Sequence, residues 1–270
     1  MTRAYELMVI IDGDVDDAKA QSWVKTITDA ITGAYRGFIG HHLQPDLISL
    51  EDIGSYRLLY LPYPLGLSPE TIERLRRWVW AGGCLVSEGC PAYLDHRGHV
   101  SPTQPPPPLA ELFGAHETSV EFTPDLLADL QLTVSDLPAR GGTFLQAYRP
   151  TTGKAIGWYE DGQVAAIENH WGQGRTLLVG SMLGAGISAH PDEPAPLLRW
   201  LLNWAGIEPH LCCSHPQVQA RLHRGPTGLW LWVINPTREQ ATVQIALGSQ
   251  WRSLSVGEVH WGGSAWEKEG

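Results

Sequence analysis

Short apolar runs and helically spaced apolar positions alternate along the first third of the chain. Runs rich in branched residues predict buried strands, whereas apolar residues three or four positions apart predict helices. The pattern predicts strands over residues 7–11, 47–49, 57–61 and 84–87. It predicts helices over residues 16–39 and from residue 69 to a stop at residues 82–83. Strand, helix and strand joined by short connections are typical of a parallel sheet covered by helices.

The second predicted helix carries signals at both ends. Ser68 is a natural N-cap, Pro69 suits the first turn, and the carboxylate of Glu70 favours the positive end of the helix dipole. Gly82 and Gly83 end the helix. The apolar stripe, which we expect to face a core, consists of Ile72, Leu75, Trp78 and Val79.

The pattern changes after the proline-rich segment 101–108, which predicts an extended loop. A short helix is expected over 109–113 and another over 197–204. Strands are expected near 118–123, 143–148, 154–159, 163–169 and 175–180. After Pro209 only strands are predicted, over 217–223, 229–234 and 241–247. We therefore expect a three-layer α/β domain over residues 1–208 and a small antiparallel β domain over residues 209–270.

Composition narrows the possible functions. The chain has 270 residues, of which 43% are apolar and 18% charged, as expected for a globular protein. Its net charge of −10 disfavours binding to nucleic acid or to an anionic membrane. The start of the chain resembles neither a signal peptide nor a membrane span. The four cysteines form no zinc pattern or disulfide framework, so we expect reduced thiols in a cytoplasmic protein.

The sharpest enzymatic hypothesis is a cysteine nucleophile. Cys90 follows a predicted strand, and His190 follows a later one, which is the order found in amidotransferase-like hydrolases. However, Pro91 directly after Cys90 has no backbone N–H to offer an oxyanion. A free-standing hydrolase using Cys90 and His190 therefore remains the alternative to a non-catalytic role.

Other chemistry-bearing residues give weaker signals. Glu88 and Glu168 are each predicted at a strand end and could form a glycosidase pair, although solvated or capping roles are more common there. The histidine pairs, His41 with His42 and His96 with His99, lack a further metal ligand. Tryptophans are candidates for sugar stacking or for the core of the β domain, namely Trp230, Trp232, Trp251, Trp261 and Trp266. We expect no metal and no cofactor.

Several stretches occur in an order that carries more information than each motif alone. They are residues 55–62 with Leu67-Ser68, residues 74–86 with Ala81-Gly82-Gly83, residues 95–100, residues 108–114, residues 172–180, and Asn235-Pro236-Thr237 in the β tail. Together they resemble the non-catalytic region of the glycoside hydrolase family 42 β-galactosidases. The resemblance covers nearly the whole chain.

The resemblance implies a trimerisation domain with a flavodoxin-like, class I glutamine amidotransferase-like fold, followed by a β-sandwich. In that family both parts follow a catalytic (β/α)₈ barrel with two glutamates, one of which follows an asparagine. The chain contains no Asn-Glu pair, and its α/β units are already assigned to the assembly domain. We therefore expect no catalytic, cofactor-binding or metal-binding residues, a homotrimer, and a catalytic barrel that was lost, removed or encoded elsewhere. The end at Trp266–Gly270 leaves open an incomplete β domain.

Overall fold

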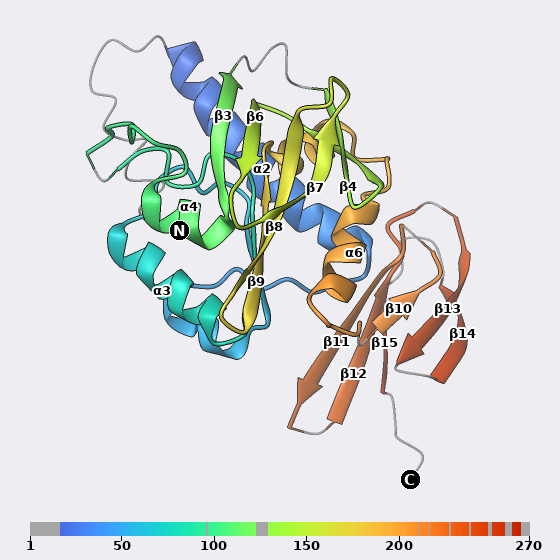
Figure 1. Cartoon of the computed structure of the whole chain (residues 1–270). Coiled ribbons are helices and arrows are strands. Elements are labelled where there is room, and N and C mark those ends of the chain that lie inside the picture. Colours follow the sequence, from blue (N-terminus) through green and yellow to red (C-terminus); the bar gives the residue numbers. More distant parts are fainter. Residues whose placement is uncertain are drawn as a thin grey trace. The chain divides into compact units, whose positions relative to one another are not determined.

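The computed structural model describes residues 17–95, 97–122, 129–209, 211–215, 217–226, 228–237, 239–247, 250–256 and 261–265 (Figure 1). The strand predicted over residues 7–11 lies outside these ranges. The chain divides into two compact units. The first contains the residues up to Tyr35 together with Leu47–Trp200, and the second contains Arg36–Asp46 together with the residues from Leu201 onward.

A seven-stranded mixed sheet forms the centre of the first unit. Its strand order is β1-β2-β9-β8-β7-β4-β5. In that order the strands are β1 (Leu58–Leu61), β2 (Cys84–Ser87), β9 (Gly174–Val179), β8 (Val164–Trp171), β7 (Lys154–Tyr159), β4 (Leu130–Val134) and β5 (Leu137–Gly141). Only the pairs β1–β2 and β2–β9 are parallel, and the other neighbours are antiparallel. Strands β3 (Ala115–Phe122) and β6 (Phe144–Pro150) form a separate antiparallel pair.

This topology shows that the predicted three-layer, flavodoxin-like or amidotransferase-like fold is wrong. A parallel pair needs a crossover of a dozen or more residues, whereas a tight turn joins only antiparallel strands. Ser135 and Asp136 alone join β4 to β5, and both have positive φ angles, as in a two-residue hairpin turn. Gly172, with φ of +60°, lies in the equally short turn between β8 and β9. The second half of the sheet is therefore a series of hairpins.

The described helices are α2 (Asp17–Gly40), α3 (Pro69–Trp80), α4 (Pro107–Phe113), α5 (Leu183–Ala189) and α6 (Pro196–Trp204), with a 3₁₀ helix, η1 (Leu50–Ser55). Of these, α2, α3, α4 and α6 agree closely with the sequence pattern, whereas α5 and η1 were not predicted. The Ser68 side chain accepts a hydrogen bond from the Thr71 N–H, which confirms the predicted N-cap of α3. The strand predicted over 47–49 is wrong, because these residues are non-regular and lead into η1.

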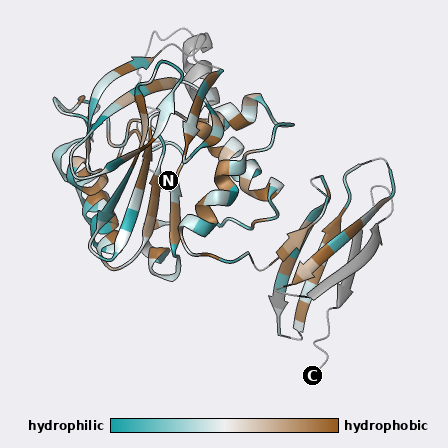
Figure 2. Ribbon diagram, turned by 45° about the vertical axis from the view of Figure 1, so that its right-hand side comes forward, coloured by the Kyte–Doolittle hydropathy of each residue, from teal (hydrophilic) through white to brown (hydrophobic). Residues whose placement is uncertain are grey.

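A large apolar cluster joins α3, α4 and several strands of the first unit. Leu75 of α3, Leu85 of β2, Phe113 of α4, Ile167 of β8 and Leu178 of β9 belong to the same buried cluster. Apolar residues follow the central strands in Figure 2. Strand β2 is buried along its whole length, as is usual for parallel strands that are covered on both faces.

The second unit contains two three-stranded antiparallel sheets. Their orders are β10-β13-β14 and β11-β12-β15, built from β10 (Leu211–Cys213), β11 (Gln219–Gly225), β12 (Gly228–Ile234), β13 (Ala241–Leu247), β14 (Gln250–Val256) and β15 (Trp261–Ala265). Leu211, Leu231 and Val243, which come from both sheets, share one buried cluster. Gln44 binds the backbone of β11, because its Oε1 accepts a 3.1 Å hydrogen bond from the Leu222 N–H.

Candidate functional site

Glu88 directly follows β2, at the carboxyl end of the parallel strands, and its side chain is fully buried. Tyr60 of β1 donates a 2.6 Å hydrogen bond to Glu88 Oε1, and the N–H of Gly184 in α5 donates a 2.9 Å hydrogen bond to the same atom. Within the described ranges, Oε2 has no hydrogen-bond partner. Burial raises the pKa of Glu88 well above its usual value, while the two hydrogen bonds act in the opposite direction. Glu88 is thus suited to remaining a neutral acid.

Cys90 lies in the tight loop after Glu88 and has a positive φ of 59°. Its N–H donates a 2.7 Å hydrogen bond to Oε1 of Gln146, and its side chain packs with Phe144 and Met182 in a buried cluster. Burial raises the pKa of the Cys90 thiol well above its usual value, and the charge of Glu117 raises it further. Because a nucleophilic cysteine needs a lowered pKa and access to substrate, Cys90 is unsuited to catalysis.

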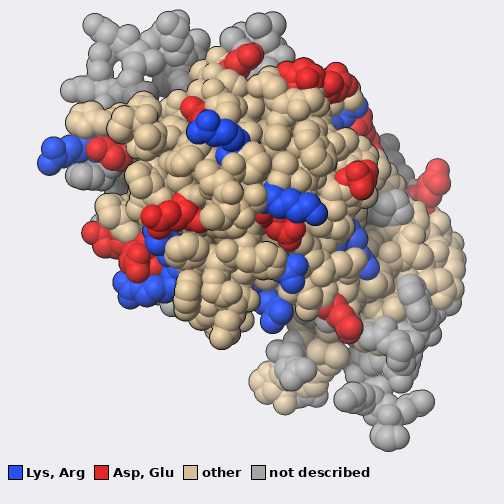
Figure 3. Space-filling model, in the orientation of Figure 1, with Lys and Arg blue, Asp and Glu red and all other residues tan. Residues whose placement is uncertain are grey.

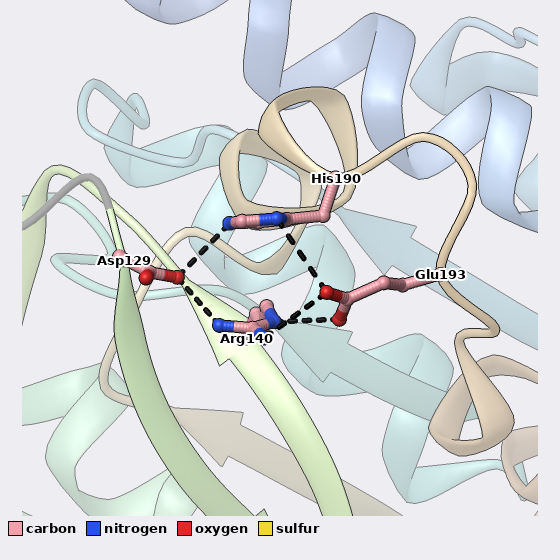
Figure 4. Close-up of polar contacts among 4 residues, drawn as sticks. All are labelled: Asp129, Arg140, His190 and Glu193. Atoms are coloured by element: carbon pink, nitrogen blue, oxygen red, sulfur yellow. Dashed lines mark hydrogen bonds and ion pairs between the residues drawn. The ribbon is translucent and has the colours of Figure 1, made fainter.

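His190 belongs to a different group of side chains, at the end of α5 (Figure 4). Its Nε2 lies 2.9 Å from Asp129 Oδ1, and its Nδ1 lies 3.6 Å from Glu193 Oε1. Arg140 of β5 joins the same two carboxylates, with 2.6 Å between Nε and Glu193 Oε2 and 2.6 Å between Nη1 and Asp129 Oδ1. We call these four residues the ion cluster.

The structure does not favour the alternative hydrolase built on Cys90 and His190. The side chain of Cys90 packs in an apolar cluster with Phe144 and Met182, whereas that of His190 pairs with two carboxylates. The physical reason is the loop after β2, which turns the thiol into an apolar cluster, while α5 carries His190 to the β5 side of the sheet.

Glu88 and Glu168 do not form a glycosidase pair either. Glu168 lies inside β8, opposite Leu177 of β9, rather than at a strand end. Strand β8 runs antiparallel to β9, so its carboxyl end lies at the edge of the sheet opposite Glu88. In the sequence both residues follow apolar runs, but only the strand pairing shows at which end of the sheet each strand finishes.

The remaining candidate residues form no further cluster in the described part of the chain. No group of three or more histidine, cysteine, aspartate or glutamate side chains is placed there to hold a metal ion. Trp230 and Trp232 are 38% and 42% exposed on β12. His96, Trp266 and the side chains of Trp251 and Trp261 lie outside what the structure describes.

The face of the molecule drawn in Figure 3 carries mixed charge. Figure 3 shows acidic and basic side chains interspersed over a mainly uncharged face, with no large area of one sign. Among the described helices, none combines the length and apolar character needed to cross a membrane.

Comparison with known families assigns the chain. The model described as β-galactosidase trimerisation domain matches residues 15–208, which is more than half of the chain. The chain belongs to the β-galactosidase trimerisation domain family. The resemblance found in the sequence is therefore confirmed. The hypothesis of an assembly domain is favoured over that of a hydrolase using Cys90 and His190.

Relatives of this trimerisation domain are found among whole β-galactosidases. β-Galactosidase GalA of Bacillus licheniformis is 26% identical over 233 residues, which are 83% of this chain and 33% of the relative. A β-galactosidase from Bacillus circulans sp. alkalophilus has the same fold at 17% identity, with a TM-score of 0.72 over 87% of this chain and 37% of that one. The enzyme from Halorubrum lacusprofundi gives 20% identity and a TM-score of 0.69 over 88% and 35%. The chain spans about a third of the length of the proteins it matches.

Sequence reasoning missed several residues that organise this trimerisation domain. Arg140 and Asp129 lie in or beside the hairpin β4–β5, which was not predicted. A signal was present, because Leu130, Leu132 and Val134 alternate with polar residues immediately before a turn. Tyr60 and Gln146 gave no comparable signal, since their role depends on strands that meet only in the folded chain.

Proposed function

We propose that the chain is the assembly region of a β-galactosidase-type glycoside hydrolase and associates as a homotrimer. The observation that carries this proposal is the match of the β-galactosidase trimerisation domain to residues 15–208. Two features are consistent with a role other than catalysis: Cys90 is a buried thiol of raised pKa, and Glu88 lies apart from Glu168. In this role the chain would bring active-site-bearing parts of the enzyme together.

We further propose that a (β/α)₈ barrel outside these 270 residues supplies the catalytic centre. The chain corresponds to about a third of GalA of Bacillus licheniformis, which leaves room in such an enzyme for a barrel. The proposed reaction is hydrolysis of β-galactosides in carbohydrate metabolism, in the cytoplasm. The four free cysteines of the chain are consistent with a reducing compartment. The proposed organisation is an assembly domain over residues 1–208 and a β domain over residues 209–270.

Light scattering coupled to size-exclusion chromatography tests the assembly proposal. The expected species has three times the 29.7 kDa mass of one chain. A dilution series separates a stable trimer from weak association. A strict monomer at the highest attainable concentration would refute self-association of this region.

A chromogenic β-galactoside tests whether catalysis belongs to a separate barrel and not to this chain. The purified chain alone is expected to give no turnover. Mixing it with a separately expressed family 42 barrel lacking this region is expected to raise both the trimer population and the activity. Robust, dose-dependent cleavage by the chain alone would contradict a non-catalytic role.

A further inference from the structure

A pocket of about 400 Å³ opens in the first unit beside the ion cluster. Strands β4, β5 and β7, helix α5 and the start of α6 contribute to its wall. Its lining is mainly apolar and includes Leu132, Ala139, Leu183, Ile187 and Leu197. The volume lies in the lower part of the range of roughly 300–1,000 Å³ that is usual for small-molecule sites. The pocket is therefore large enough for one or two small rings.

Trp158 lines the same pocket and is 42% exposed, although most tryptophans bury a larger part of their surface. An exposed indole offers a flat apolar face together with an N–H donor. Such a face binds the C–H side of a saturated ring, while hydroxyl groups on the ring edge remain free for hydrogen bonds. This combination selects a flat, amphipathic ligand over a purely apolar one.

The polar residues that line the pocket are Gln131, Thr133, Arg140, Tyr159, Glu160, His190 and Glu193. The guanidinium of Arg140 is already occupied, because Nε and Nη2 bind both oxygens of Glu193 at 2.6 and 3.0 Å and Nη1 binds Asp129 at 2.6 Å. An anionic ligand would meet the carboxylates of Glu160 and Glu193 and a guanidinium whose donors are engaged. The charges therefore disfavour an anionic ligand.

We propose that this pocket binds a neutral sugar, as a single pyranose or as the end of a disaccharide. One face of the ring would lie against Trp158 and the apolar lining. Its hydroxyls would donate to lone pairs of Glu193, because each carboxylate oxygen accepts more than one hydrogen bond. The site goes beyond the proposed assembly function and does not depend on trimer formation.

Isothermal titration of the purified chain with galactose, glucose and lactose tests the proposal. We expect saturable binding of at least one neutral sugar with a Kd on the order of 1 mM. Galacturonate, which has the same ring with one negative charge, should bind at least about fivefold more weakly, since it would meet the carboxylates of Glu160 and Glu193. Equal or tighter binding of galacturonate would overturn the charge argument and with it the proposal.

Two variants and one control locate the site. Trp158→Ala is expected to weaken sugar binding at least about tenfold, because the stacking face is lost. Trp80→Ala is the matched control: Trp80 is 59% exposed and lies outside the pocket, so its loss should leave binding unchanged. Ala139→Phe, which fills the pocket, should abolish binding, with circular dichroism verifying that each variant folds.

The opposing outcomes are equally definite. Absence of saturable heat with all three neutral sugars up to about 50 mM would overturn the proposal. If Trp158→Ala left sugar binding intact but changed the molar mass in light scattering, the pocket would be a contact between copies of the chain rather than a sugar site. Trimer formation is measured separately, so failure of the sugar site and failure of assembly are distinguishable.

Discussion

Tyr60 donates a 2.6 Å hydrogen bond to the buried carboxyl group of Glu88, and this pair links β1 to the end of β2. Burial raises the pKa of both groups well above their usual values, so neither is expected to ionise readily in the folded chain. Among the described residues Oε2 of Glu88 has no hydrogen-bond partner, which is compatible with a protonated carboxyl group, because an isolated buried carboxylate would carry a much larger desolvation cost.

The first prediction concerns the pH dependence of stability. Glu88 has a raised pKa in the folded chain, so its contribution to stability is full below the unfolded value of about 4.3 and is lost as pH rises toward the folded value. Glu88→Gln removes this titration. The free energy of unfolding of the variant, minus that of the wild type, should therefore increase as pH rises from 5 to 8, by up to about 1.4 kcal/mol per pH unit.

Urea unfolding at several pH values measures this difference. Glu121→Gln, at an exposed position on β3, is the control and should follow the wild-type profile. Parallel profiles for Glu88→Gln and the wild type would show that Glu88 does not hold its proton in the folded chain.

The second prediction concerns thiol reactivity. Cys90 is completely buried with a raised pKa, whereas Cys212 is partly exposed. Iodoacetamide should therefore modify Cys212 well before Cys90 in the native chain, because alkylation requires both access and thiolate. Peptide mass spectrometry gives the order, and labelling in denaturant is the control in which the difference should disappear. Rapid native labelling of Cys90 would reopen the question of a thiol nucleophile.

The third prediction concerns the ion cluster. The hydrogen bond from Arg140 is the main cause that lowers the pKa of Glu193, so this contribution to stability is present above the unfolded pKa and is lost as pH falls through the folded one. Arg140→Gln should lower Tm by about 2–4 °C at pH 7. The difference should shrink near pH 3 and in 1 M salt.

Thermal unfolding followed by circular dichroism measures this effect. Arg77→Gln removes an exposed helical pair with Glu73 and should change Tm much less. If the Tm difference between Arg140→Gln and the wild type changed with neither pH nor salt concentration, Arg140 would stabilise the fold by packing and not by its charge.

The fourth prediction concerns the close approach of α2 and α5. A Cβ atom added at Gly33 would lie 1.8 Å from the carbonyl oxygen of Gly184, so the two helices would have to separate. Gly33→Ala should lower the free energy of unfolding by about 2–3 kcal/mol. At Gly40, at the end of the same helix, an added Cβ meets nothing within 4 Å, and Gly40→Ala should be neutral or slightly stabilising. Equal effects of the two substitutions in urea unfolding would contradict this packing.

Local signals predicted most of the individual elements. The stripe from Ile72 to Val79 and the N-cap at Ser68 define α3, because these features act within a few residues of the chain. The strands at 154–159 and 174–179 were likewise visible as apolar runs. The apolar runs did not indicate whether neighbouring strands run parallel or antiparallel, since a buried strand has the same composition in either kind of sheet.

The candidate site depended even more on long-range contacts. Cys90 and His190 occur in a suggestive order, yet the fold gives them separate partners 56 and 61 positions away, Gln146 and Asp129. One of the two hydrogen bonds that the Glu88 side chain accepts likewise comes from α5, almost a hundred residues later.

The sequence by itself determined the family, the positions of most helices and strands, and the change to β structure after Pro209. These features are encoded in short windows and in the order of motifs along the chain. Only the tertiary structure decided the mixed hairpin topology, the neutral environment of Glu88 and the ion cluster around Arg140. The physical reason is that strand direction, desolvation and charge pairing depend on tertiary contacts between distant segments, and local periodicity does not specify those contacts.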